Sequence, residues 1–303
     1  PSIASVRILL ARGAKVDARD DERKTPLYLA AARGNHKAVR MLLDAGAEID
    51  AQDSVSEFTP LVRAVMNGHD QVVDELLRRG ANAQYTGAGW TLLHYAAGFK
   101  GTARTIEMLL DHGLDVDARD GDGNTPLDNI RLRSDHGSSK AITEFLIEKG
   151  ADIHASDKRG YVPLHGAAGS GAVGMLDVLL EKGANVNVRS EAGEIPLHLA
   201  AHMAACPAAT RLIEAGAQVN SQAKNGETPL HYAARGWAKD TQLAKVITLL
   251  LKHGANPDIK DKAGRTPLDV AKRRLRGNAA ILRALAAPKP PEGRMPRHPT
   301  ETK

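Results

Sequence analysis

Thr228-Pro-Leu-His-Tyr-Ala-Ala234 is the stretch of sequence that decides the fold, because near copies of it recur along the whole chain. The copies begin at Thr25, Thr59, Thr91, Thr125, Val162, Ile195, Thr228 and Thr266. Successive starts therefore lie 34, 32, 34, 37, 33, 33 and 38 residues apart. A repeat of about this length predicts a solenoid of stacked structural units.

A second marker runs in phase with the first: an apolar pair, usually Leu-Leu, followed three residues later by Gly. The eight glycines are Gly13, Gly46, Gly80, Gly113, Gly150, Gly183, Gly216 and Gly254. We expect each of them to end a helix in the left-handed conformation, which a residue without Cβ adopts freely. Thr at the start of a unit can cap a helix, and Pro after it suits the first helical position. Each unit is therefore predicted to run helix, turn, helix, loop.

The two predicted helices of a unit differ in bulk. Ala-Ala pairs such as Ala31-Ala32 and Ala233-Ala234 let a neighbouring helix approach the first helix closely, whereas paired leucines enlarge the second. Stacked wedges of this kind are expected to curve. The polar loop between Gly183 and Gly193 alternates polar and apolar residues, which predicts an extended arm with a tight turn.

This pattern resembles the ankyrin repeat, whose consensus carries Thr-Pro-Leu-His and ends in Gly-Ala-Asp-Val-Asn. Ile195-Pro-Leu-His198 and Gly183-Ala-Asn-Val-Asn187 match that consensus closely. The resemblance covers about residues 3 to 287. It implies an all-α repeat solenoid of stacked helix-turn-helix pairs with β-hairpin fingers on one edge, and a non-enzymatic module that binds a protein partner.

The two ends of the chain predict its domain limits. Residues 5–20 align at an offset of 33 with residues 38–53, so residues 1–287 are expected to form one solenoid that starts at the second helix of a repeat. We interpret the chain on this basis as a fragment or a processed product. Residues 288–303 are rich in Pro and basic residues and lack apolar periodicity, which predicts a disordered tail.

Positive charge is concentrated at the C-terminal end. Residues 260–303 hold 12 Lys and Arg against 4 Asp and Glu, a net charge of +8, so the first 259 residues carry −3 of the chain's +5. A solubilising cap on an exposed repeat explains this charge, and binding of a polyanion is the alternative. Nucleic acid is disfavoured as the partner, because no aromatic residue lies between Arg273 and Lys303 to stack on bases.

Several strings imitate functional motifs without their context. Gly169-Ser-Gly-Ala-Val-Gly174 spells a dinucleotide fingerprint, but it joins two predicted helices instead of following a strand. Asp120-Gly-Asp-Gly-Asn124 begins like a calcium loop and lacks its later ligands. His198, His202 and Cys206 have zinc-ligand spacing, yet His198 occupies the ordinary motif position and Pro207 interrupts the helix. We therefore expect no metal, no cofactor and no catalytic site, and the His of the motif is expected to hydrogen-bond within its turn.

Aromatic residues supply the candidate binding surface. We call the position just before each Thr-Pro-Leu copy the finger slot, and three of the chain's ten aromatics occupy it. The slot residues are Lys24, Phe58, Trp90, Asn124, Tyr161, Glu194, Glu227 and Arg265. The resemblance places this slot on the fingers, facing the concave side where partners commonly dock.

From this placement Phe58, Trp90 and Tyr161 are predicted as apolar anchors for the partner. Lys24, Glu194, Glu227 and Arg265 are predicted as the charged flank of that surface. Tyr95 and Tyr232 are expected to line it from the first helices, and Trp237 lies in an insertion near residues 236–242. A second insertion lies near residues 133–139. The alternative is that each slot aromatic packs on a neighbouring finger as local structure.

The sequence leaves the identity and setting of the partner open. A monomer is expected, with no membrane span, because no run approaches the ~18 apolar residues that a spanning helix needs. One cysteine, Cys206, is compatible with the cytoplasm and does not exclude a periplasmic or secreted location. The alternative function is a regulatory or targeting ankyrin segment of a larger enzyme or membrane protein.

Overall fold

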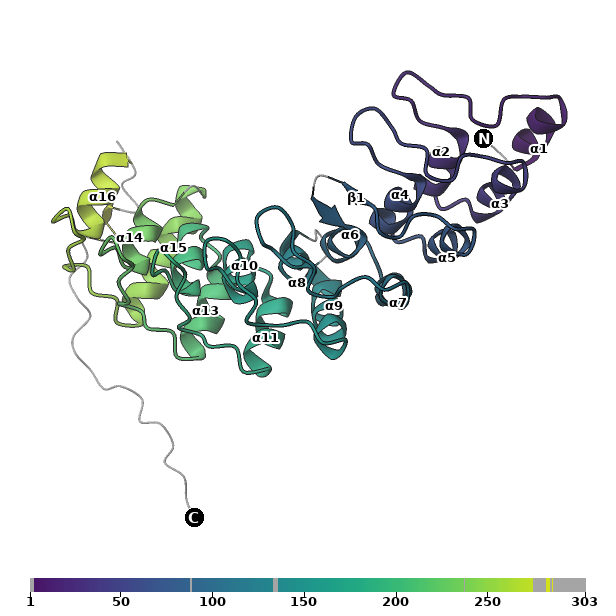
Figure 1. Ribbon diagram of the computed structural model, residues 1–303. Helices are drawn as coiled ribbons and strands as arrows, with labels where there is room; N and C mark the ends of the chain where they lie inside the picture. The colour runs from purple at the N-terminus through teal and green to yellow at the C-terminus, as the bar shows by residue number, and fades with distance from the viewer. Residues whose placement is uncertain are drawn as a thin grey trace, which may run out of the picture. The chain divides into compact units, whose positions relative to one another are not determined.

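A computed structural model describes residues 3–87, 89–132, 136–236, 238–274, 282, 283 and 285. The chain divides into two compact units. Unit 1 comprises residues 1–167 and 172–184, and unit 2 comprises residues 168–171 and 185–303. The predicted all-α repeat solenoid is confirmed, since the described secondary structure is helical apart from one short strand pair (Figure 1).

Helices of unit 1 form two rows. The first helices of the repeats are α2 (Pro26–Ala32), α4 (Pro60–Asn67), α6 (Leu92–Gly98) and α8 (Pro126–Asn129), which continues into the 3₁₀ turn η1 (Ile130–Leu132). The second helices are α1 (Ile3–Ala11), α3 (His36–Asp44), α5 (Asp70–Arg78), α7 (Ala103–Asp111), α9 (His136–Glu148) and α11 (Val173–Glu181). Neighbours within each row contact each other, as do the two helices of a repeat such as α2 and α3.

Unit 2 repeats the same arrangement. Its first helices are α12 (Pro196–His202), α14 (Pro229–Ala234) and α16 (Pro267–Arg274), and its second helices are α13 (Cys206–Glu214) and α15 (Asp240–Lys252). The division between the units falls inside α10 (Pro163–Ser170). The leucine of the Thr-Pro-Leu copy is fully buried at Leu27 of unit 1 and Leu197 of unit 2, and only half-buried at Leu268 of the last copy, so the repeated motif supplies core between the rows.

The repeated motif caps each first helix in the way its sequence predicts. Thr25 Oγ1 accepts a hydrogen bond from the Tyr28 N–H at 3.2 Å. In the third repeat His94 Nδ1 accepts from the Thr91 N–H at 3.2 Å, and His94 Nε2 lies 3.1 Å from the Asn124 carbonyl oxygen. The motif His therefore ties its own helix start to the next finger, which confirms its predicted structural role.

The second helices end at glycine. Gly46 and Gly216 have φ of 84° and 90°, and a Cβ built on either would meet no atom within 4 Å. At Gly46 the following N–H, that of Ala47, donates to the Leu42 carbonyl at 3.0 Å and closes the turn. Backbone conformation alone, not crowding, therefore requires glycine at these two positions.

The fingers differ from regular β-hairpins. Among the described residues, strand pairing occurs only between β1 (Thr86–Gly87) and β2 (Trp90–Thr91), in antiparallel register with Gly87 opposite Trp90. Most other fingers close through two backbone hydrogen bonds and form no strand; in one of them the Asp157 N–H donates to the Tyr161 carbonyl at 2.8 Å and the Gly160 N–H donates to the Asp157 carbonyl at 3.0 Å. In that finger the Asp157 carboxylate accepts the N–H groups of Arg159 and Tyr161, and these bonds replace a second rung of the ladder.

Within the described part of the chain, the helices fall short of the length and apolar character that a membrane crossing requires.

Candidate partner-binding surface

Rings from two neighbouring fingers and from α6 gather in unit 1. The ring centroids of Phe58 and Trp90 each lie 5.3 Å from that of Tyr95. The ring of Phe99 lies 6.4 Å from those of Trp90 and Tyr95. We call Phe58, Trp90, Tyr95 and Phe99 the aromatic cluster. These separations are typical of aromatic pairs, so the four rings form one contact unit.

Exposure varies across the aromatic cluster. Phe58 and Trp90 are half-buried, and Phe99 at the end of α6 is 38% exposed. Tyr95 is only 3% exposed, so it supports the other rings from below and does not line an open groove as the sequence had predicted. Its hydroxyl donates to the Gly87 carbonyl at 2.8 Å, and burial raises the pKa of Tyr95 to about 12. Tyr95 therefore stays neutral and fixes the finger against α6.

Sequence reasoning missed Phe99, although a signal for it was present. Phe99 is four residues after Tyr95, so the two share a helix face. Tyr161 does not join the aromatic cluster: it is half-buried, and its ring packs at 5.1 Å from that of His165 in α10.

Unit 2 places charges where unit 1 has rings. We call Glu194, Glu227, Tyr232, Arg235 and Arg265 the polar cluster. Tyr232 donates its hydroxyl to Glu194 at 2.5 Å, and the Arg235 guanidinium lies 4.0 Å from the centre of the Tyr232 ring. Glu227 forms ion pairs with Arg235 at 3.0 Å and with Arg265 at 3.5 Å. Both carboxylates of this region are therefore paired within the protein, while the buried Nε of Arg235 has no hydrogen-bond partner among the described residues.

Burial corrects the predicted charged flank. Glu194 and Glu227 are only 7% and 3% exposed, so they are internal and not surface carboxylates. The physical reason is that donors from the same unit replace water around each carboxylate. Tyr232, predicted to line the groove, is likewise buried at 4% exposure, and burial followed by its bond to Glu194 raises the pKa of Tyr232. Lys24 is half-buried and pairs with Glu22 of its own finger.

Some predicted features lie outside the described residues. Trp237 is one of them, and so are residues 286–303, which include the whole predicted tail. Most of the basic C-terminal end therefore has no structural description. Arg265, at its start, is described, and its guanidinium is held by Asp261 at 2.6 Å.

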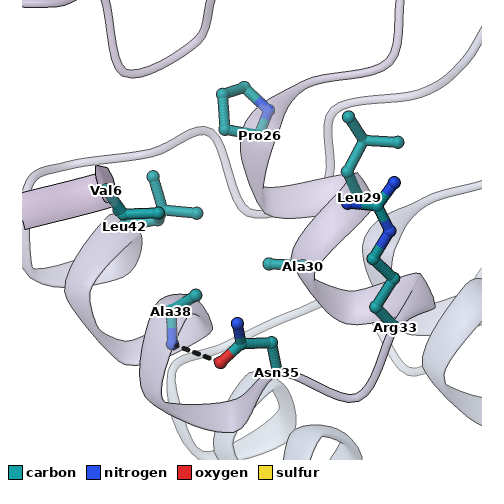
Figure 2. A pocket seen from close by; sticks show the side chains of 8 residues that line it. All are labelled: Val6, Pro26, Leu29, Ala30, Arg33, Asn35, Ala38 and Leu42. Carbon is teal, nitrogen blue, oxygen red and sulfur yellow. Dashed lines mark hydrogen bonds between the residues drawn. The ribbon is translucent and has the colours of Figure 1, made fainter. Parts of the chain in front are cut away.

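A cavity of about 200 Å³ opens between α1, α2 and α3 (Figure 2). It is lined by Val6, Pro26, Leu29, Ala30, Arg33, Asn35, Ala38 and Leu42. α2 packs against α4, the first helix of the next repeat. On the cavity side lies α1, which is a second helix and contributes Val6 to the lining. None of the predicted partner-binding residues lines this cavity.

The motif imitations occupy ordinary structural positions. His198 and His202 lie in α12, and their rings contact the Glu227 and Tyr232 carbonyl oxygens at 3.2 and 3.4 Å. Cys206 begins the next helix, α13, as Pro207 had suggested. Across the described residues, groups of three or more His, Cys, Asp or Glu suited to a metal ion do not occur. The glycine string at residues 169–174 joins α10 to α11.

The family model for ankyrin repeats, described as three copies, matches overlapping segments that together cover nearly the whole chain. The matched residues are 2–87, 61–157, 132–223 and 197–292. This chain belongs to the ankyrin repeat family. Ankyrin repeats are general protein–protein interaction modules and are not catalytic in themselves.

Curated relatives place similar repeats in longer proteins. Palmitoyltransferase AKR1 of Lachancea kluyveri is 30% identical over 170 residues, 54% of this chain and 22% of the relative. The human transient receptor potential cation channel subfamily A member 1 is 32% identical over 112 residues, 36% of this chain and 10% of the channel. Mouse ankyrin repeat and SOCS box protein 16 is 38% identical over 167 residues, 52% of this chain and 36% of the relative. The chain thus spans about a third or less of the length of these three relatives.

Proposed function

We propose that the chain is a non-enzymatic protein-binding module whose partner contacts the aromatic cluster of unit 1. The observation that carries this proposal is that Phe58, Trp90 and Phe99 remain partly exposed around the buried Tyr95. Contiguous exposed aromatics are costly in water, and Trp and Tyr are enriched where partners bind most strongly. Tyr161, on a later finger of the same unit, is a further contact in this proposal.

Rigid presentation is the proposed mechanism. Tyr95 is fixed by its bond to Gly87, and His94 ties α6 to the next finger. The rings therefore lose little conformational freedom when a partner covers them, so less of the contact energy is offset by ordering. The fingers and first helices act together as a preformed surface.

Affinity capture from the lysate of the source organism tests the proposal. The wild-type chain is compared with the triple variant Phe58→Ala, Trp90→Ala, Tyr161→Ala, and recovered proteins are measured by mass spectrometry. Met203→Ala is the matched control, because Met203 is 53% exposed in unit 2 at the repeat position that Phe99 occupies in unit 1. We expect the triple variant to lose partners that the wild type and the control retain. Equal recovery by all three, with unchanged circular dichroism, would contradict the aromatic surface.

A second candidate is that the repeats regulate or target a larger enzyme or membrane protein. It is favoured by the names of two relatives, a palmitoyltransferase and a cation channel, of which this chain spans 22% and 10%. Determining the full reading frame that contains residues 1–303 tests it. A frame that encodes no further domain would contradict this second candidate.

A further inference from the structure

Exposed apolar surface continues from the aromatic cluster into the next repeat. Leu132, at the end of η1, is 44% exposed. A Cβ built on Gly98 would lie 3.6 Å from Leu132 Cδ1, so this side chain packs against the last turn of α6, at the residue that precedes Phe99. We call Phe58, Trp90, Phe99 and Leu132 the apolar stripe. Its residues belong to three successive repeats, so a partner that covers it lies across the repeats.

The described fingers beside the apolar stripe leave no strand edge open to a partner. Strand pairing among the described residues occurs only between β1 and β2. On one side of that finger the Tyr85 hydroxyl donates to the Glu57 carbonyl of the preceding finger at 2.6 Å. On the other side a Cβ built on Gly89 would lie 3.4 Å from the Gly121 nitrogen of the following finger. An extended segment therefore has no ladder to join here, whereas an α-helix satisfies its own backbone hydrogen bonds.

Charges of opposite sign lie on the two sides of the apolar stripe. The exposed Glu57 directly precedes Phe58, at the finger end of its repeat. The exposed Lys100 directly follows Phe99 at the C-terminal end of α6, and Arg131 directly precedes the leucine of the stripe at the end of η1. None of these three charged side chains takes part in an ion pair between described residues. The finger side of the stripe is therefore negative and the helix-end side is positive.

Glu57 has a backbone conformation for which most other fingers use glycine. Its φ is 57°, in the left-handed region. Arg23 holds the equivalent position of the first finger with φ of 59°. The other equivalents are Gly89, Gly123, Gly160, Gly193, Gly226 and Gly264. A residue with Cβ is strained there, and such strain is concentrated where a side chain has a function. This conformation is a second observation, independent of the exposed rings, that points to Glu57 as a contact residue.

We infer that the apolar stripe binds an amphipathic α-helix of a partner protein, with a basic side chain facing Glu57 and an acidic side chain facing Lys100. The inference rests on the proposed function and specifies the partner. Apolar residues three or four positions apart on that helix cover the stripe, and each polar flank meets the opposite charge. A helix with flanks of one sign meets repulsion on one side. An anionic membrane surface fits less well, because the Glu57 carboxylate lies beside the stripe.

Selection from two phage-displayed libraries tests the chemistry of the partner. One library displays a helical scaffold that is randomised on one face and on both flanks of that face, and the other displays unstructured linear peptides of the same length. We expect the wild type to enrich helices that carry apolar residues between one basic and one acidic flank. Binders from the linear library alone, helices with flanks of a single sign, or no binders from either library overturn the inference.

Charge reversal then tests which side chains face the two flanks. Trp90 fluorescence reports binding of a selected helix in a Trp237→Phe background, because the chain holds two tryptophans. We expect Glu57→Lys or Lys100→Glu to lower the affinity about fivefold, the size expected when an exposed ion pair becomes a repulsion. Reversal of the facing charge in the helix should restore the affinity. Arg40→Glu, which changes an exposed cation on the second-helix row, is the control and should have no effect. Losses that reversal in the helix does not restore overturn the pairing.

Glycine substitutions separate a contact role of Glu57 from a structural role. Glu57→Gly should weaken binding of the helix without lowering the urea midpoint, because relief of the strained φ offsets the added freedom of the unfolded chain. Arg23→Gly is the matched control, since it relieves the same strain on a finger outside the apolar stripe and should leave binding unchanged. Equal affinity of the wild type and Glu57→Gly overturns the inference.

The outcomes separate this inference from the proposed function. Binders that need Phe58 and Trp90 but respond to neither Glu57→Lys nor Lys100→Glu leave the proposed function standing and overturn the inference. Binders that retain their affinity for the Phe58→Ala, Trp90→Ala variant contradict the aromatic surface itself. Vesicles of phosphatidylcholine and phosphatidylserine that displace every selected helix also overturn the inference, because they would identify a membrane as the preferred target. Circular dichroism of each variant confirms that the fold is kept.

Discussion

Tyr95 in unit 1 and Tyr232 in unit 2 occupy the same repeat position in opposite environments. Both are buried and both donate their hydroxyl to an oxygen acceptor, Gly87 carbonyl for one and Glu194 carboxylate for the other. The rings of Phe58, Trp90 and Phe99 lie around Tyr95. Tyr232 instead contacts the Glu194 carboxylate, the Arg235 guanidinium and the rings of His198 and His202. The repeat fixes where the tyrosine lies, and the finger slots decide what it contacts.

The two units differ in whether their slot residues bind partners within the protein or remain partly exposed. In unit 2 the slot residues Glu194 and Glu227 bind Tyr232, Arg235 and Arg265, so both slot carboxylates are used within the protein. In unit 1 the slot residues Phe58 and Trp90 pack against Tyr95 and bind no charged group, and Phe99 beside them stays exposed. The slot residues Glu194 and Glu227 thus stabilise unit 2 internally, whereas Phe58 and Trp90 in unit 1 stay partly exposed to solvent.

Removing a slot carboxylate from unit 2 should have the largest effect on stability. We expect Glu227→Ala to lower the free energy of unfolding by about 2–3 kcal/mol, because Arg235 loses its ion pair and Arg265 is left with Asp261 alone. Urea unfolding measures the change. Glu191→Ala, which removes an exposed carboxylate from a finger of the same unit, is the control and should change stability by less than about 0.5 kcal/mol. Equal effects of the two substitutions would break the contrast between the units.

Acid should weaken unit 2 through its buried motif histidine. Burial lowers the pKa of His198 to about 4 from the usual 6.5. Below pH 6.5 the unfolded chain takes up a proton that the folded His198 refuses, so stability falls as the pH drops from 6.5 toward 4. We expect a loss of about 2 kcal/mol at pH 5, and His198→Gln should remove this part of the pH dependence. Urea unfolding of both proteins at pH 7.5 and pH 5 measures it.

Unit 1 should respond to acid with the opposite sign at the equivalent position. Asp128 occupies the place of the motif His in α8, and burial raises the pKa of Asp128 to about 6 from 3.8. The folded state therefore binds a proton more readily than the unfolded chain, so this residue's contribution to stability grows as the pH falls from above 6 toward 3.8. Asp128→Asn should steepen the loss of stability on acidification. A shallower acid response of that variant would show that Asp128 is not held in its neutral form.

The smallest expected effect distinguishes the two tyrosine hydroxyls. Tyr232→Phe should lower the free energy of unfolding by about 1.5 kcal/mol, because Glu194 loses a donor to its buried charge. Tyr95→Phe should lower it by about 0.5 kcal/mol, because only a neutral carbonyl loses its donor. Paired urea titrations of the two variants measure the difference. The reverse order would mean that the carboxylate of unit 2 is satisfied without Tyr232.

The repeated residues allowed most of the fold to be predicted, because their roles are local. Thr25 caps the helix that follows it, Gly46 ends the helix before it, and His94 reaches only to the next finger. Each role depends on neighbours within about one repeat, which the sequence displays directly. The departure of most fingers from β-pairing depends instead on side-chain bonds such as those accepted by Asp157, which compete with the ladder.

The candidate site was predicted less completely, because its members belong to different repeats. Phe58 and Trp90 follow from the finger slot, but the burial of Glu194 depends on Tyr232, 38 residues further along the chain. Phe99 follows Tyr95 by four residues, a helical spacing that the sequence could have indicated. The sequence of one repeat does not show which charged side chains are paired, because the partner lies in a neighbouring repeat, as Tyr232 does for Glu194.

The open space beside Gly46 and Gly216 has a consequence for synthesis of this chain by chemical ligation. Both residues have positive φ and nothing near the position of an added methyl group. A D-alanine residue prefers that backbone region, so it would adopt the positive φ without the strain that an L-residue incurs there. It would restrict the unfolded chain more than glycine does, and replacement of glycine by a compatible residue typically adds about 0.4–1 kcal/mol of stability. D-residues at these two positions would therefore stabilise the turns that follow α3 and α13 and would leave the aromatic cluster unchanged.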